Sequence, residues 1–352
     1  MPQTSRLIPI LLLAWACGDA HAPDGPSDGF QWPVSEPAAE GMNADLLDDA
    51  HALVRSSLPN VSAFLVVRHG AIVAERYYHE HSADRIRAVR SVTKTFISAF
   101  VGIALGQGWI DSLDQTIGGF FPEYEDSGDS LMQQVTIRQL LTMTSGIDFE
   151  RNGSVSQTNP NTVEGIFNGP FWTDPGGGFW YDGANPHLLS AIISRQAGKN
   201  IATLGETYLF GPLNIVRGAW TSDEQGVTDG GTGLSLTARD MAKLGQLYLQ
   251  DGVWEGERIL PEGWVEQSVA PSVILGPESW ANYGFLWWVT DVLGAPAYIA
   301  AGFRQQFIIV LPTLDIVTVI QSELDLRGEE RNHLILAANY VIPAVRAGAG
   351  TR

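Results

Sequence analysis

Apolar and polar residues alternate at a helical period in some parts of the chain and at a strand period in others. An early helix is predicted from apolar residues at helical spacing, namely Met42, Leu46, Leu47, Ala50, Leu53 and Val54. Residues 62–78 have the composition of two strands joined at His69-Gly70, a dipeptide that suits a tight hairpin. A helix followed by an antiparallel hairpin is typical of the start of an α+β sheet protein.

Further helices and strands follow from the same patterns. The stretch after Ser91 has a broad apolar face and ends at Gly106, and a second amphipathic helix is predicted from its N-cap Thr237 to Gly252. Helical patterns and irregular loops fill residues 111–268. The remaining predicted elements are four strands and a closing helix, at 283–290, 295–303, 304–312, 315–322 and 331–345.

This order of elements places strands near both ends of the chain and helices between them. The sheet is therefore expected to be assembled from both chain ends, with a helical lobe inserted between the two halves. Such a chain forms one unit of two lobes, and a site built from both lobes would lie in the cleft between them.

Composition narrows the class of function. Hydrophobic residues make up 45% and charged residues 17% of the 352 residues, as in a globular protein. The formal net charge of −18 argues against nucleic-acid binding, which needs a positive surface, and against adhesion to anionic lipid headgroups. The seven histidines show no metal-ligand spacing, so neither a metal nor another cofactor is predicted.

The N-terminus has features of an export signal. Arg6 precedes a short apolar run, so residues 1–16 are predicted to be a signal peptide, too short to span a bilayer. Cys17, the only cysteine, follows Ala14-Trp15-Ala16, an order similar to the cleavage box of bacterial lipoproteins. Lipidation of Cys17 is one expectation, and ordinary signal-peptidase cleavage is the alternative.

The expected location follows from this signal. The protein would be exported, either periplasmic, anchored to a membrane only through the N-terminal lipid, or secreted. Residues 17–40 begin with a run rich in Gly, Pro and Asp and are predicted to be a flexible linker. Residues 41–346 are predicted to form the folded domain.

The run "AVRSVTKTFI" carries the candidate chemistry. On a helix, Ser91 and Lys94 are one turn apart and share a face. A serine hydroxyl becomes a good nucleophile only when a base accepts its proton, and a lysine can be that base only when burial or a nearby cation lowers its pKa. Many helices contain S-x-x-K by chance, so the alternative is a lysine that extends to water.

Five stretches in order carry a resemblance: "LVVRHGAIVAE", "RSVTKTFISAFVGIALGQGWI", "TIRQLLTMTSGI", "GGTGLSLTARDMAKLGQLYL" and "YGFLWWV". From Met42 to Val345 the chain resembles the serine β-lactamase and penicillin-binding-protein superfamily. It is most similar to the class C β-lactamase-like branch, with family VIII carboxylesterases and 6-aminohexanoate-dimer hydrolases. The resemblance implies a β-lactamase-like α+β fold, with an antiparallel sheet built from both chain ends, flanking helices and an inserted helical lobe.

The resemblance also implies a catalytic set. Ser91 would form an acyl-enzyme with the help of Lys94, and "FWYDGANPHLLSAII" matches the family's Y-x-N or Y-x-S motif at Tyr181. Gly183 stands where that motif has Asn or Ser, so the amide expected to bind substrate is absent. Asn185, two residues further on, is the candidate replacement.

The third family motif, K-T-G or H-x-G, matches Ala300-Ala301-Gly302, where only the glycine is kept. The N–H groups of Phe303 and Ser91 would then form the oxyanion hole. Arg304 is a candidate for the missing cation, with a solvated strand residue as the alternative. Trp180 is a candidate for the acyl pocket, with plain packing in the helical lobe as the alternative.

These features predict an exported serine hydrolase that acts on a small-molecule ester or amide, most simply as a carboxylesterase. The alternatives are amide or oligomer hydrolysis, β-lactam hydrolysis and D-amino-acid peptidase action, of which the last two are disfavoured by the missing lysine of the third motif. From another class, a non-catalytic binding lipoprotein could use the same fold. Such a protein would be free to lose the Ser91, Lys94 and Tyr181 that this chain retains.

Overall fold

The computed structural model describes residues 29–126, 129–149, 161–323 and 333–348. The predicted signal peptide and Cys17 lie outside the described residues. The centre of the molecule is a seven-stranded sheet in the order β2-β1-β11-β10-β9-β8-β7, and every neighbouring pair is antiparallel. Its strands are β1 Val61–Arg68, β2 Ala71–Tyr77, β7 Asn282–Tyr283, β8 Trp288–Val292, β9 Ala295–Gly302, β10 Gln306–Leu311 and β11 Ile316–Ser322.

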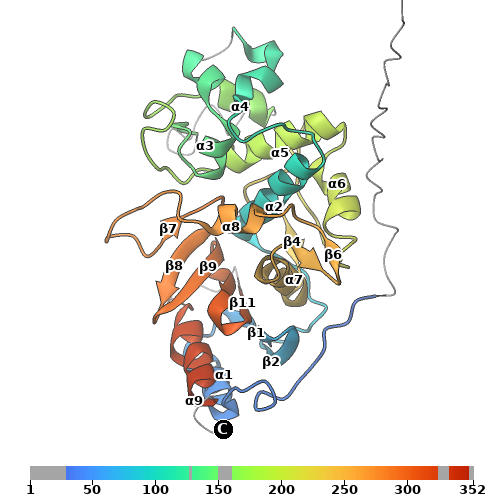
Figure 1. Cartoon of the computed structure of the whole chain (residues 1–352), viewed down its shortest axis with the longest axis vertical. Coiled ribbons are helices and arrows are strands. Elements are labelled where there is room, and N and C mark those ends of the chain that lie inside the picture. The colour runs from blue at the N-terminus through green and yellow to red at the C-terminus, as the bar shows by residue number, and fades with distance from the viewer. Residues whose placement is uncertain (1–28, 127–128, 150–160, 324–332, 349–352) are drawn as a thin grey trace, which may run out of the picture.

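The sheet is assembled from both chain ends, as the sequence predicts. β1 pairs with β11 over its whole length, so that Leu65 lies opposite Val319. The hairpin between β1 and β2 turns at His69 and Gly70, which both have positive φ angles. The predicted β-lactamase-like α+β architecture is confirmed (Figure 1).

Helices cover both faces of the sheet, which is why β1 and β11 are buried almost throughout. Alternate residues of β1 point to opposite faces. Phe64 packs under α1 Ala44–Ser57, α9 Ile342–Gly348 and the π-helical turn Ala337–Val341, whereas Leu65 joins the core that contains α7 Ala238–Leu249. The first and last helices therefore lie side by side, as Figure 1 shows for α1 and α9.

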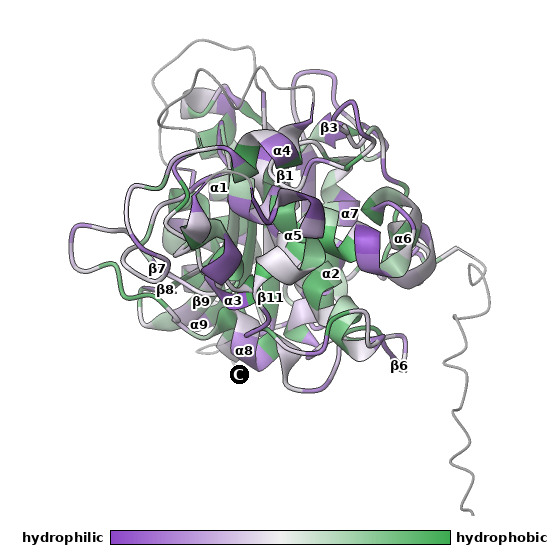
Figure 2. Ribbon diagram, turned by 90° about the horizontal axis from the view of Figure 1, so that it is seen from above, coloured by the Kyte–Doolittle hydropathy of each residue, from purple (hydrophilic) through white to green (hydrophobic). Residues whose placement is uncertain are grey.

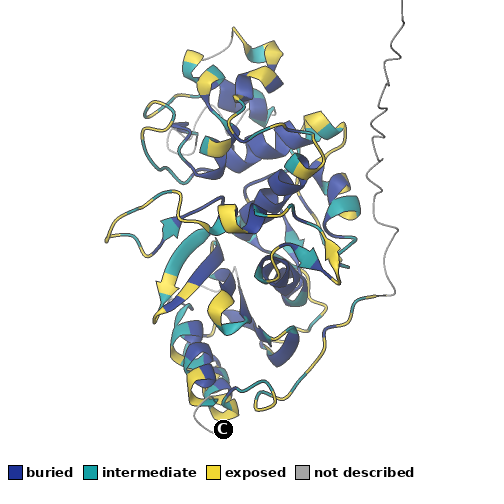
Figure 3. Ribbon diagram, viewed as in Figure 1, coloured by how far each residue is buried: buried dark blue, intermediate teal, exposed yellow. Residues whose placement is uncertain are grey.

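Helix α2, Thr93–Gly106, occupies the middle of the molecule. Twelve of its fourteen residues are buried, including Lys94 (Figure 3). The sequence predicts one broad apolar face, but α2 contacts β9 as well as α5 and α6 of the helical lobe, so its flanks are covered too. Figure 2 shows α2 as a mainly hydrophobic helix. The helix that follows Ser91 is thus anchored by packing rather than by solvent-exposed contacts.

The helical lobe is inserted between the two halves of the sheet, as predicted. α5 is its centre and contacts α2, α3, α4 and α6. No helix in the described part of the chain is long and apolar enough to cross a membrane. The lobe and its connections comprise α3 Ile137–Leu141, α4 Thr162–Phe167, α5 Ala184–Ala197, α6 Ile201–Tyr208, α8 Trp264–Val269, the short strands β3 Arg87–Ala88, β4 Ser235–Leu236, β5 Val253–Trp254 and β6 Glu257–Arg258, and the 3₁₀ turns Arg90–Val92, Ile117–Phe120, Pro122–Tyr124 and Ser130–Gln134. A further 3₁₀ turn, Pro312–Leu314, joins β10 to β11 within the sheet.

The predicted linker needs a correction at its C-terminal end, because residues 29–40 pack on the domain. The Phe30 ring lies 4.7 Å from that of Trp254, and Trp32 Nε1 donates to the carbonyl of Arg239. Ser35 N donates to the carbonyl of Ile72 beside strand β2. Two aromatic residues in this stretch supply apolar surface that a free linker would leave in water, and this explains why residues 29–40 pack on the domain.

Candidate active site

Ser91 lies in the 3₁₀ turn Arg90–Val92, which runs directly into α2. Arg90 has a φ of +53°, a left-handed conformation that non-glycine residues adopt only when their surroundings impose it. Neighbouring bonds impose it here. Val89 N donates to Leu234 O at 2.9 Å, and Thr93 Oγ1 donates to Arg90 O at 2.7 Å. The turn therefore holds Ser91 in a fixed place relative to α2.

Lys94 is directed towards Ser91 and not towards water. Its Nζ lies 3.0 Å from Ser91 Oγ and 2.9 Å from the carbonyl oxygen of Gly231, and the residue is only 3% exposed. Both oxygens are uncharged. The alternative of a lysine that extends to solvent is therefore excluded by the geometry, and the two side chains are within the range required for proton transfer.

Tyr181 completes the group. Its ring centroid lies 4.9 Å from Lys94 Nζ, it stacks on Trp288 with an interplanar angle of 25°, and it meets Tyr283 edge-on. The next residue, Asp182, is fully buried and accepts hydrogen bonds from the backbone N–H groups of Ala184 and Phe149. Asp182 thus fixes the start of α5 and, with it, the backbone of Tyr181.

Gly302, the last residue of β9, allows this strand to approach the nucleophile. A Cβ at this position would lie 2.5 Å from the carbonyl oxygen of Val89 and 3.3 Å from Cβ of Arg90. Neither neighbour is the free end of a flexible side chain, so only glycine permits the contact. Phe303, the predicted donor to the oxyanion, follows immediately.

Gly302→Ala is expected to push β9 away from the Ser91 turn and to lower kcat by about 10²-fold, since misplacing a catalytic donor by about 1 Å has effects of that size. Gly119→Ala is the matched control, because no atom lies within 4 Å of a Cβ built there. Measuring kcat of both variants by steady-state kinetics tests this expected loss. Unchanged kcat in Gly302→Ala would show that the close approach has no role.

These residues open onto a cleft of about 640 Å³. Ser91, Tyr181 and Gln305 supply its polar groups. Among the described residues that line it there is no acidic or basic side chain, and the others are apolar or glycine: Trp280, Trp288, Ala301, Gly302, Phe303, Phe307 and Leu334. The cleft therefore favours a neutral, apolar ligand.

The structure brings together Ser91, Lys94, Tyr181, Gly302 and Phe303, but three other predicted substrate-binding residues do not line the cleft. All three are close to Tyr181 in sequence, but the chain leads away from the cleft on both sides of it. Trp180 faces Trp172 in the lobe, Gly183 lines a separate hollow of about 340 Å³, and Asn185 is buried within the first turn of α5. Because α5 begins at Ala184, Asn185 is part of a buried helix rather than of a loop at the cleft.

Arg304 also lies outside the cleft lining, contrary to its prediction as a replacement cation. Its guanidinium lies over the ring of Phe303, 5.2 Å from the centroid. β9 ends at Gly302, and Arg304 has a φ of +62°. The regular alternation of a strand, which would have returned Arg304 to the face of Gly302, is therefore broken between them.

Several cleft residues were not predicted as site residues: Trp280, Trp288, Gln305, Phe307, Leu334 and the Lys94 partner Gly231. Two of them lie in stretches that resemble the family in sequence: Trp288 in "YGFLWWV" and Gly231 in "GGTGLSLTARDMAKLGQLYL". Trp280, Gln305 and Leu334 lie in connections, where periodicity carries no information, and Phe307 lies in β10, where the strand pattern alone does not show that it faces the cleft.

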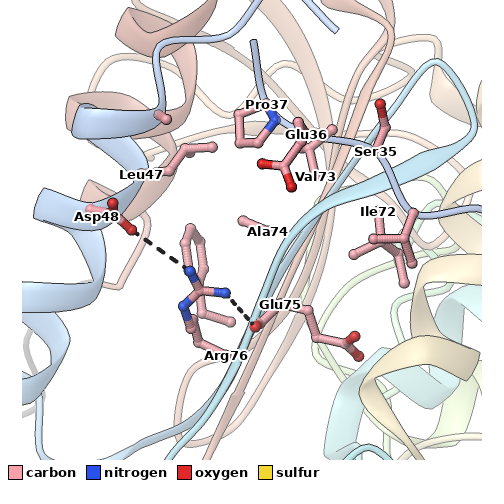
Figure 4. A pocket seen from close by; sticks show the side chains of 13 residues that line it. Ser35, Glu36, Pro37, Leu47, Asp48, Ile72, Val73, Ala74, Glu75 and Arg76 are labelled. Carbon is pink, nitrogen blue, oxygen red and sulfur yellow. Dashed lines mark hydrogen bonds and ion pairs between the residues drawn. The ribbon is translucent and has the colours of Figure 1, made fainter. Parts of the chain in front are cut away.

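A second hollow lies on another part of the molecule, between α1, β2 and residues 34–37 (Figure 4). Arg76 there is bonded to the carbonyl of Glu75 and lies 3.7 Å from Asp48. Among the described residues that line the hollow, the one hydroxyl residue, Ser35, donates to Glu40, and none is a lysine or histidine. This hollow therefore lacks the nucleophile–base pair found at Ser91. In the part of the chain that the structure describes, no three metal-binding side chains gather.

Comparison with known proteins agrees with the geometry. A family model described as β-lactamase matches residues 51–340. The 6-aminohexanoate-dimer hydrolase of Paenarthrobacter ureafaciens is 30% identical over 226 residues, which are 59% of this chain and only 57% of that relative.

Solved structures show the same fold. A Bacillus anthracis protein provisionally assigned as a 6-aminohexanoate-dimer hydrolase has a TM-score of 0.74 at 21% identity, over 94% of this chain and 90% of its own. EstCE1, a hydrolase with promiscuous acyltransferase activity, has a TM-score of 0.69 at 17% identity, over 88% of this chain and 98% of its own. The chain therefore belongs to the β-lactamase family.

Proposed function

We propose that this protein is a serine hydrolase that forms an acyl-enzyme at Ser91 and that acts on uncharged esters. The observation that carries the proposal is the 3.0 Å contact between Lys94 Nζ and Ser91 Oγ at an apolar cleft. A buried amine beside a hydroxyl at the end of a pocket is the arrangement that nucleophilic catalysis needs.

In the first half-reaction, the neutral amine of Lys94 accepts the proton of Ser91 as Oγ bonds to the ester carbonyl carbon. The N–H groups of Ser91 and Phe303 receive the negative charge that develops on the carbonyl oxygen. Collapse of this intermediate breaks the bond to the leaving oxygen, which takes a proton from the Tyr181 phenol. Lys94 then returns a proton to Tyr181, whose ring lies 4.9 Å from Nζ.

Deacylation follows the same path in reverse, with water in place of the alcohol. Tyr181 passes its proton to Lys94 and takes a proton from water as the water oxygen attacks the acyl carbon, and Ser91 then leaves with the proton held by Lys94. The stack of Tyr181 on Trp288 keeps the phenol ring oriented through both steps.

The cleft favours esters over β-lactams and peptides with a free C-terminus. Those substrates carry a carboxylate, and none of the described residues that line this cleft has a cationic side chain. A carboxylate without a partner is costly to remove from water. Esters also have better leaving groups than amides and so need less assistance from Tyr181. Amide or oligomer hydrolysis is the second candidate, supported by the 30% identity to the 6-aminohexanoate-dimer hydrolase.

The proposal is tested by comparing kcat/KM for p-nitrophenyl butyrate and for a chromogenic cephalosporin. We expect the ester to be preferred by at least about 10²-fold, because the cephalosporin's carboxylate lacks a partner. Ser91→Ala should reduce hydrolysis of both to background. Faster turnover of the cephalosporin would overturn the ester assignment, and equal ester turnover by Ser91→Ala would overturn the nucleophile.

A further inference from the structure

The connection between β9 and β10 has an unusual backbone. Gly302 pairs with Gln306, so Phe303, Arg304 and Gln305 form the turn between the two strands. Arg304 has a φ of +62° and Gln305 a φ of +63°. Left-handed positions in hairpin turns are normally taken by Gly or Asn, because other side chains are strained there. Two consecutive strained residues need external support to persist.

Gln306 supplies the first part of this support. Its side chain is fully buried, and the amide bonds to both backbone groups of Ser322: Nε2 donates to Ser322 O at 2.9 Å, and Oε1 accepts from Ser322 N at 3.2 Å. Nε2 also reaches the carbonyl of Arg304 at 3.3 Å. Backbone pairing of β10 with β11 ends at Phe307, so the Gln306 side chain continues the ladder and ties the turn to the end of β11.

Ser322 and His333 supply the second part. The Ser322 hydroxyl donates to Gln305 O at 3.3 Å and lies 3.0 Å from His333 Nδ1, while His333 N donates to Gln305 Oε1 at 3.1 Å. Burial lowers the pKa of His333 to about 4, so its ring is neutral at pH 7 and carries one proton. With that proton on Nδ1, the ring donates to Ser322 and Ser322 donates to Gln305, which satisfies all three groups.

The turn that these residues support forms part of the cleft wall. Phe303 and Gln305 line it, and so does Leu334, which follows His333. We propose that Gln306, Ser322 and His333 are positioning residues that hold the Phe303–Gln305 turn in its left-handed conformation and so direct the Phe303 N–H at the oxyanion. This inference rests on the proposed function, because the oxyanion role of Phe303 belongs to it.

Gln306→Leu tests the inference against a matched control, Gln321→Leu. Gln321 is also buried, and its amide donates to Leu236 O and lies against Met241 Sδ, away from the turn. Both variants are expected to lower the melting temperature. Only Gln306→Leu should lower kcat for p-nitrophenyl butyrate, by about 10- to 100-fold with KM within about threefold, because an oxyanion donor acts in the transition state.

If Gln306→Leu fails to fold, a second pair of variants still tests the positioning role. His333→Phe removes the donor to Ser322, whereas His333→Asn offers an amide N–H in its place. We expect His333→Phe to lower kcat about 10-fold and His333→Asn to restore most of it. A loss of packing alone would not be rescued by the smaller Asn.

The outcomes separate this inference from the proposed function. A wild-type enzyme without Ser91-dependent ester hydrolysis would overturn the proposed function and the inference with it. An active wild-type enzyme whose Gln306→Leu and His333→Phe variants keep full kcat would overturn the inference alone. The same would follow if Gln321→Leu lost as much kcat as Gln306→Leu.

Discussion

Lys94→Met is expected to lower kcat/KM for p-nitrophenyl butyrate by about 10²- to 10⁴-fold, the range assigned to a positioned general base. Its melting temperature should stay within a few degrees of the wild-type value. Methionine fills a similar volume to lysine. Only two oxygens lose the hydrogen bond from Lys94: Ser91 Oγ, which lines the cleft, and one backbone carbonyl oxygen.

Lys243→Met is the matched control, since Lys243 is another buried lysine. Its Nζ lies 2.8 Å from Asp240 Oδ1 and bonds to the carbonyl of Asn214. Neutralising it leaves the Asp240 carboxylate buried without its cation, at about 3–5 kcal/mol, and should lower the melting temperature by roughly 5–8 °C. Lys243 does not line the cleft, so kcat/KM of the folded protein should be unchanged.

Lys94→Met is therefore expected to lose activity and keep its stability, whereas Lys243→Met is expected to lose stability and keep its activity. Kinetics and thermal unfolding of both variants measure this directly. If Lys94→Met kept more than about a tenth of the wild-type kcat/KM, Lys94 would not be the base. If both variants lost activity and stability in parallel, neither effect could be assigned to the chemistry at Ser91.

Asp182→Ala is expected to destabilise the protein by about 3–5 kcal/mol. Asp182 is fully buried, and its two oxygens accept from Phe149 N at 3.1 Å and from Ala184 N at 2.7 Å. Alanine leaves both backbone donors without this partner in the interior. The adjacent Tyr181 would lose its anchor, so kcat per folded molecule should fall as well.

Asp129→Ala is the control for this variant, since Asp129 caps the 3₁₀ turn Ser130–Gln134 through Leu131 N at 3.0 Å but is exposed. Its loss should cost about 1 kcal/mol or less, because water replaces the carboxylate. Urea unfolding monitored by circular dichroism compares the two. Equal destabilisation by both substitutions would show that the buried carboxylate has no special role.

Local geometry explains why part of this site could be predicted. Ser91 and Lys94 are three residues apart at the start of a helix, so their contact is fixed by helix geometry once the helix forms. The His69-Gly70 turn and the Thr237 cap are local as well, and the structure shows both, with Thr237 Oγ1 accepting from Asp240 N. Signals of this kind need no tertiary information.

The rest of the site depends on contacts between distant parts of the chain. Gly231 reaches Lys94 across 137 residues of sequence, and the aromatic cleft wall comes from Trp280 and Trp288. The prediction for Arg304 assumed a regular strand, which the left-handed turn after Gly302 breaks. Sequence periodicity describes regular elements, whereas Gly231, Trp280 and Arg304 lie in the connections between them and Trp288 is the first residue of β8.

The central claim is that Ser91, activated by Lys94, is the nucleophile. The most direct test is to treat the protein with a fluorophosphonate and to measure the intact mass, followed by peptide mapping. The account predicts one adduct per molecule on Ser91, no adduct in Ser91→Ala and much slower labelling in Lys94→Met. An unlabelled wild-type protein, or an adduct that persists in Ser91→Ala, would contradict it.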